Sequence, residues 1–174
     1  TPQPTAVVQP QVTAKSGGVL RTIFRNDPED WDPHKALGGA PPLRSSTSAV
    51  FTPLFTKDWP AAGQCGTSQV PVLAQSWKWL DSSTFEVKIR QDVKFHDKPP
   101  VNGRPLTIQD VAYSLERLRK EATYIKSLTD QISGVQVTGP DTVRITTKGP
   151  FPALFPSILS NYYGAEVVLA RESG

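Results

Sequence analysis

The chain has 174 residues, of which 37% are hydrophobic and 20% charged, a balance typical of a soluble folded domain and not of a disordered chain. Its net charge of +3 arises from 19 basic and 16 acidic residues spread along the sequence, which argues against a nucleic-acid-binding surface. A single cysteine, Cys65, excludes an intrachain disulfide, and His34 and His96 are too few and too far apart for a structural zinc site. We therefore expect no metal and no other cofactor.

Residues 1–15 are rich in proline, glutamine and threonine and predict an extended, solvated tether. Such a segment is either an inert disordered terminus or a spacer between a membrane anchor and the folded body. The chain does not begin with Met and has no apolar leader, so we interpret it as a mature or trimmed product. No apolar run approaches the roughly 18 residues that a membrane-spanning helix needs.

Order is expected to begin after Gly17-Gly18, because residues 19–25 (VLRTIFR) are rich in β-branched and aromatic residues and predict a strand. Proline and aspartate then indicate a loop as far as Pro41-Pro42. Residues 48–55 (SAVFTPLF) suggest a short helix interrupted by Pro53.

A β-hairpin is predicted with Trp77 and Trp79 on one face of its first strand and a turn at residues 81–83. In the returning strand, residues 84–90, apolar and charged residues alternate with a period of two, as in a half-buried antiparallel strand. A second hairpin is expected at residues 135–147, around a turn at Gly139-Pro140-Asp141.

Between the hairpins, a loop at residues 98–103 precedes a helix that Thr107 opens, with Asp110 as its capping-box partner. Apolar residues at helical spacing give this helix one buried stripe, Ile108, Val111, Leu115 and Leu118. A small basic cluster is expected in its last turn, where cations offset the helix dipole: Arg117, Arg119 and Lys120.

The last third of the chain predicts a helix over residues 151–159, from apolar spacing and an early Pro152, although Pro156 disagrees with it. Residues 166–174 indicate a short strand that runs into a further turn or helix.

Catalytic motifs are not evident in the sequence. It has no G-x-S-x-G elbow, no P-loop, no G-x-G-x-x-G and no obvious nucleophile–base pair. His96-Asp97 could be a tuned imidazole, but such a pair more often orders a turn. We therefore expect a protein that is not an enzyme; a hydrolase would need an activity that His96→Ala or Asp97→Ala abolishes without unfolding.

Six blocks of sequence, taken together, resemble family 5 of the bacterial extracellular solute-binding proteins, the dipeptide, oligopeptide and nickel binders. Residues 89–97 (IRQDVKFHD) and 103–117 (GRPLTIQDVAYSLER) are similar to that family's R-D-G-V-K-F-H-D-G and T-A-E-D-V-x-x-S-L-E-R. Four shorter blocks accompany them in the family's order: GGVLR at 17–21, DPH at 32–34, LAQSW at 73–77 and PFPAL at 150–154. Lys98 and Gln91-Asp92 depart from the family pattern, both within a turn.

The resemblance implies a mixed α/β chain with the periplasmic-binding-protein type II fold, of which this chain would hold part of lobe I and an added small domain. The expected division is a tether at 1–16, the first part of lobe I at 17–50, the small domain at 51–160 and a return into lobe I at 161–174. The complete protein would be about three times as long, and its second lobe would hold the termini of a bound peptide.

Ligand contacts are expected in two places. In the oligopeptide binders the loop after D-P-H lines the ligand site, which here would be Leu37, Gly38, Gly39 and Ala40; glycine lets backbone approach a ligand closely. The alternative is a merely flexible turn. Asn161, Tyr162 and Tyr163 could add hydrogen bonds and aromatic surface, against the alternative of plain interdomain packing.

These features predict part of an extracytoplasmic receptor, in the periplasm or at the cell surface and anchored through a lipidated N-terminus, which delivers an oligopeptide to the permease of an ABC importer. Nickel complexes or oligosaccharides are alternative ligands, and the remaining C-terminal lobe would be a partner. The rival interpretation is an autonomous, non-catalytic interaction module. A severed piece should expose apolar surface around residues 19–24 and 167–169, whereas a true domain should not.

Overall fold

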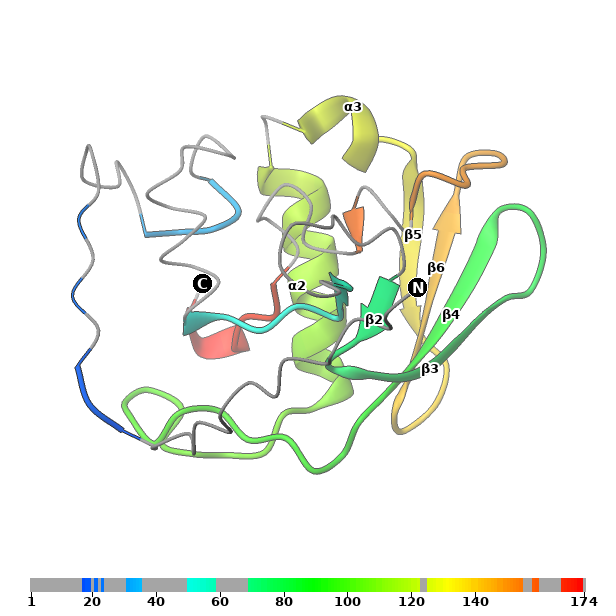
Figure 1. Ribbon diagram of the computed structural model, residues 1–174. Coiled ribbons are helices and arrows are strands. Elements are labelled where there is room, and N and C mark those ends of the chain that lie inside the picture. The colour runs from blue at the N-terminus through cyan, green and yellow to red at the C-terminus, as the bar shows by residue number, and fades with distance from the viewer. Residues whose placement is uncertain are drawn as a thin grey trace, which may run out of the picture.

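The computed structural model of the protein describes residues 17–19, 21, 23, 31–35, 50–58, 69–122, 125–154, 158–159 and 167–173. Its centre is an antiparallel sheet with the strand order β3-β4-β6-β5 (Figure 1). The predicted hairpins are confirmed: β3 (Ala74–Trp79) pairs with β4 (Thr84–Ile89), and β5 (Ile132–Val137) pairs with β6 (Thr142–Thr147). The mixed α/β character is also confirmed, while the domain boundaries remain predictions.

The central strands β4 and β6 divide their side chains between two faces. On the inner face, Phe85 lies opposite Ile145 and Val87 opposite Val143, and all four are buried. On the outer face Glu86 lies opposite both Lys78 and Arg144, with ion-pair distances of 3.3 and 3.1 Å. The period-two pattern therefore sets both the core and a solvated row of alternating charge.

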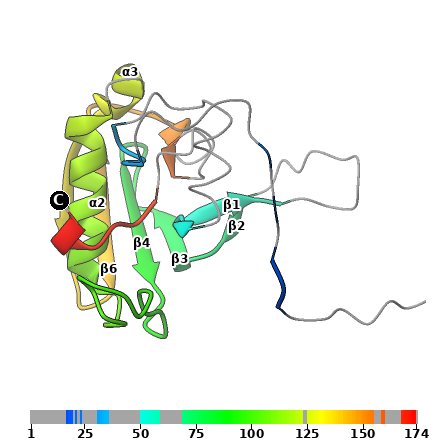
Figure 2. The same ribbon diagram turned by 90° about the vertical axis from the view of Figure 1, so that its left-hand side faces the viewer.

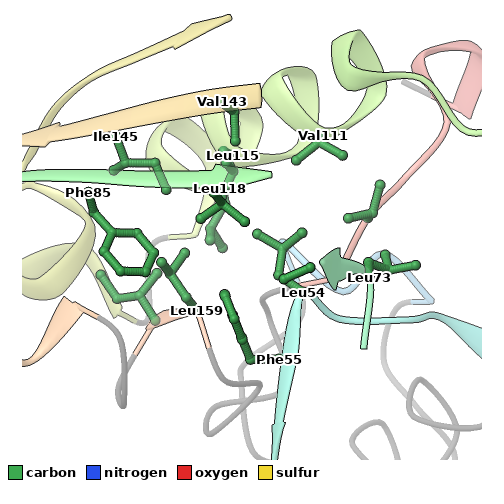
Figure 3. Close-up of a cluster of buried hydrophobic side chains, with 14 of the residues drawn as sticks. Leu54, Phe55, Leu73, Phe85, Val111, Leu115, Leu118, Val143, Ile145 and Leu159 are labelled. Carbon is green, nitrogen blue, oxygen red and sulfur yellow. The ribbon is translucent and has the colours of Figure 1, made fainter. Parts of the chain in front are cut away.

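Helix α2 (Ile108–Glu121) packs along one face of the sheet, against β5 and β6 (Figures 1 and 2). Its predicted apolar stripe is buried, and the predicted capping box at Thr107 and Asp110 is present. The short helix α3 (Lys126–Thr129) follows it and leads into β5. Figure 3 shows side chains of α2 and of the inner sheet face pointing toward one another in a single core, which includes Val111, Leu115, Leu118, Phe85 and Ile145.

The predicted helix at residues 48–55 is wrong in its second half. Leu54 and Phe55 are fully buried, and Phe55 begins the strand β1 (Phe55–Lys57), which pairs with β2 (Gln69–Pro71). Pro53 lacks the N–H that a helix would need at this position. The backbone groups of residues 55–57 pair with β2 instead. The Phe55 ring then meets Trp77 edge-on, with 5.1 Å between ring centroids.

Three other expectations near the ends of the chain also change. Within residues 19–25 the described Val19, Arg21 and Ile23 form no strand, because no described strand lies beside them to complete a ladder. The helix predicted over residues 151–159 is confirmed only in part and is not α-helical: the described Leu154 and Ile158 are π-helical, and the Leu159 N–H donates to the Leu154 carbonyl, five residues earlier, at 3.1 Å. Proline removes one of the donors that a regular helix would use.

Residues 167–170 likewise form no strand but lead into the short 3-10 helix η3 (Arg171–Ser173), so the predicted helical turn is confirmed. Val167, Val168 and Leu169 are buried, against the exposure expected of a severed piece, whereas Val19 and Ile23 are 85% and 99% exposed. The difference arises because residues 167–173 lie against α2, beside which Figure 1 shows η3.

The packing of Phe85 leads to a prediction about stability. Replacing Phe85 with alanine would leave a cavity between β4 and α2, and we expect the free energy of unfolding of this chain to fall by about 3–5 kcal/mol. Lys88→Ala, on the outer face of the same strand, is the control and should change it little. Urea denaturation followed by circular dichroism measures both, and equal losses in the two variants would contradict this core.

Candidate functional site

A cavity of about 450 Å³ opens beside α2, where residues 31–33, 50–52, the loop 93–106 and residues 168–170 meet. Its volume is in the range of small-molecule sites. The walls are mostly apolar and include Phe51, Leu73, Phe95, Leu106 and Val168. Asp32 and Arg117 bring opposite charges to one wall.

Arg117 forms a two-pronged ion pair with Asp32, 85 residues earlier in the sequence. The Arg117 Nη1 donates to Asp32 Oδ1 at 2.8 Å, and Nη2 donates to Oδ2. The Asp32 carboxylate also accepts the backbone N–H of His34 at 3.0 Å, and the Lys35 N–H closes the turn onto the Asp32 carbonyl at 3.2 Å. The hydrogen bonds from Arg117 lower the pKa of Asp32 from 3.8 to about 2, despite the opposing effect of burial.

This contact corrects the expectation that Arg117 neutralises the last turn of the helix. The basic residues of that turn are Arg119 and Lys120, and Arg119 pairs with Glu116 at 2.7 Å. Arg117 lies one turn earlier and is only 12% exposed. Its spacing of seven residues from Asp110 places both on one side of α2, a signal that the sequence already contained.

Asp110 is a buried carboxylate that accepts hydrogen bonds from a loop, from the start of α2 and from Arg171. Its side chain is fully buried and accepts hydrogen bonds from Arg104 at 2.7 and 2.8 Å and from the Thr107 hydroxyl and N–H at 2.7 and 3.0 Å. The Arg171 N–H donates to it at 3.3 Å. Burial alone would raise the pKa of Asp110, but the hydrogen bonds from Arg104 and Thr107 outweigh it and hold the pKa well below its usual value.

Arg104 extends this network to the cavity and to η3. Its Nε donates to Glu172 Oε1 at 2.9 Å, and its guanidinium lies 4.8 Å from the centroid of the Phe95 ring. The two carboxylates raise the pKa of Arg104. One arginine therefore connects the cavity wall at Phe95, the N-terminus of α2 and the last described segment of the chain.

Ser114 completes a row of polar side chains on α2. The Leu169 N–H donates to the Ser114 Oγ at 2.8 Å, and that Oγ lies 2.8 Å from the Asp110 carbonyl and 3.2 Å from the Leu169 carbonyl, either of which can accept its proton. We call Asp110, Ser114 and Arg117 the polar stripe. It holds residues 167–173 through its first two members and residues 31–35 through its third.

His96 has the turn-ordering surroundings expected of it. Its backbone carbonyl accepts the N–H groups of Lys98 at 2.8 Å and Gly103 at 3.1 Å. Asn102 and Gly103 have positive φ values of 46° and 69°, conformations that asparagine and glycine adopt at low cost. The His96 Nε2 lies 3.4 Å from the Val50 carbonyl.

The predicted ligand residues Leu37, Gly38, Gly39, Ala40, Asn161, Tyr162 and Tyr163 all lie outside the described residues and remain predictions. Among the residues that are described, no three His, Cys, Asp or Glu side chains gather as metal ligands. Within the same residues no helix has the length and apolarity to cross a bilayer.

Comparison with known proteins identifies the family. The sequence profile of the bacterial extracellular solute-binding proteins, family 5 (middle region), matches residues 68–172. The chain belongs to this family. The glutathione-binding protein GsiB of Escherichia coli K12 is 34% identical over 93 residues, which are 52% of this chain but 17% of that protein.

Solved structures of periplasmic solute-binding proteins share the fold. MoaA from A. tumefaciens R10, in complex with mannopinic acid, has a TM-score of 0.69 and 27% identity over 84% of this chain and 28% of its own. DppA from Helicobacter pylori, in complex with the peptide STSA, has a TM-score of 0.68 and 20% identity, over 84% of this chain and 30% of the DppA chain. The predicted periplasmic-binding-protein type II fold is thus confirmed, and the chain spans less than a third of these relatives.

The buried carboxylate of Asp110 leads to a prediction. Asp110→Asn would weaken the hydrogen bonds to Arg104 and leave its cation without a buried counter-charge, so we expect a loss of about 3–5 kcal/mol in the free energy of unfolding. Asp130→Asn is the matched control, because Asp130 forms an exposed pair with Lys126; its midpoint should hardly move. Urea denaturation compares the two, and similar midpoints would contradict the role given to Asp110.

The pKa of Asp32 leads to a second prediction, which concerns acid. Because the folded pKa of about 2 lies below the ordinary 3.8, the stabilisation from this group is complete above about pH 4–5 and is lost as the pH falls through about 2. Carboxyl-carbon NMR should find Asp32 titrating near 2 in the native chain and near its ordinary value in Arg117→Met. An unchanged pKa in that variant would show that Arg117 is not its cause.

Proposed function

We propose that this chain is the N-terminal part of an extracytoplasmic solute-binding receptor that delivers an oligopeptide to the permease of an ABC importer. The observation that carries the proposal is the family match over residues 68–172, together with a shared fold over 84% of the chain. We further propose that the proline-rich residues 1–16 are a spacer that follows a lipidated anchor.

The described residues support a scaffold role for this part of the receptor. Ion pairs and buried hydrogen bonds fix residues 31–35 and 167–173 on α2. In the sequence, Leu37–Ala40 follow the first of these segments and Asn161–Tyr163 precede the second. In the sequence the proposed ligand contacts are thus only a few residues from segments that the scaffold holds in place, which is the basis on which we propose preorganised binding.

The identity of the solute is the finer part of the proposal. The relatives named above bind glutathione, mannopinic acid and a peptide. A peptide and glutathione both contain amide bonds and terminal charges, which favours an oligopeptide for this chain. Nickel complexes and oligosaccharides are the alternative solutes.

The test is a thermal-shift screen on the complete protein encoded by the reading frame that carries this chain. The panel contains di- to nonapeptides, glutathione, mannopinic acid, nickel–histidine complexes and oligosaccharides. We expect a peptide at a hundred times its Kd to stabilise the folded state by about 2.7 kcal/mol, which is several degrees in midpoint. A shift with sugars or metal complexes but not with peptides would overturn the solute, and no shift with any compound would contradict the receptor function.

The 174-residue chain alone is the control for this screen. Closure around a solute needs both lobes of a hinged receptor, so we expect no shift with the compounds that stabilise the complete protein. A comparable shift in the short chain would favour the rival interpretation, an autonomous binding module. The burial of Val167–Leu169 is the observation in favour of that rival.

A further inference from the structure

The turn at residues 31–35 approaches α2 at the third member of the polar stripe. Its backbone closes on itself through Asp32, whose carboxylate accepts the His34 N–H while its carbonyl accepts the Lys35 N–H. The same carboxylate presents both of its oxygens to Arg117. The group that shapes the turn is therefore also the group that meets the helix.

The ion pair is largely removed from water, since the Asp32 and Arg117 side chains are 20% and 12% exposed. Either charge without the other would remain desolvated, so the turn cannot slide along α2 without a large penalty. The hydrogen bonds to Asp32 are the largest cause that raises the pKa of Arg117, and the nearby Tyr113 and Glu121 raise it further. Lys35 adds a longer contact to Asp32, at 3.9 Å.

Both partners also line the cavity, together with Trp31 and Pro33 of the turn. A planar guanidinium that engages both carboxylate oxygens fixes orientation as well as distance, which a lysine ammonium would not do. The cavity wall formed by residues 31–33 belongs to no described helix or strand. The ion pair from Asp32 to Arg117 therefore positions it, together with the burial of Pro33 and of the adjoining His34.

We infer that Arg117 is a positioning residue, which docks the turn at residues 31–35 on α2 and so sets one wall of the cavity. The relevance of this wall to solute capture depends on the receptor function proposed above; the docking itself does not. Arg117 is thereby distinguished from Arg119, a helix neighbour whose partner, Glu116, lies on the same helix.

Hydrogen exchange of backbone amides in the complete protein tests the inference. In Arg117→Met we expect the amides of His34 and Lys35, both of which donate to Asp32, to exchange at least about tenfold faster, as for a lost charge-assisted hydrogen bond. The amides of β4 and β6 should keep their rates. Arg119→Met is the matched control and should leave the turn unchanged, whereas Arg117→Lys, which keeps the charge but not the fork, should give an intermediate rate.

Restoring the pair in reverse separates positioning from a merely structural effect. The double variant Asp32→Arg with Arg117→Asp should recover protection of the Lys35 amide, which donates to the backbone carbonyl of residue 32, but not of the His34 amide, which donates to the Asp32 carboxylate. Each single charge reversal should lose both. Unchanged exchange in Arg117→Met, or equal acceleration in the turn and in β4 and β6, would overturn the inference. Since the exchange measurement needs no solute, it can fail while the thermal-shift screen succeeds, and the reverse also holds.

Discussion

The buried carboxylate of Asp110 is the interaction on which the arrangement of the described structure depends. It caps α2, forms an ion pair with Arg104 and accepts a hydrogen bond from the Arg171 N–H. It therefore joins the start of a helix, a loop and the last described segment. A carboxylate in that position is stable only while all these donors are present, because an unsatisfied buried charge is costly. The surrounding segments are consequently interdependent.

Helix α2 has two faces with different roles. Its apolar stripe supplies the core that holds the sheet, while its polar stripe attaches segments that have no sheet of their own. Hydrophobic contact is non-directional and tolerates small shifts, whereas hydrogen-bonded ion pairs fix register. The helix is thus a core element on one side and a docking element on the other. The block that resembles the family, residues 107–117, contains all of the polar stripe together with Val111 and Leu115 of the apolar stripe.

The sequence predicted what local periodicity determines. Local signals predicted the hairpins and α2. The first hairpin follows from the alternation at Phe85, Val87 and Ile89, and the start of α2 follows from the spacing of Thr107 and Asp110. Phe55 and Arg117 were misjudged because their partners, β2 and Asp32, are distant in the sequence. The spacing from Asp110 indicates the side of α2 on which Arg117 lies, but no local pattern identifies Asp32 as its partner. The ligand residues came from resemblance alone, since backbone contacts to a solute impose little on side-chain identity.

The row of charges on the outer sheet face has a consequence for how the protein behaves among its own copies. Strand β3 is an edge of the four-stranded sheet, and on its inner face Trp77 and Trp79 are each 38% exposed. An apolar edge of this kind invites another strand to add to it. Lys78 stands between the two tryptophans, and its side chain is 64% exposed. A strand arriving at this edge would have to desolvate that ammonium, which disfavours pairing between copies of the protein there.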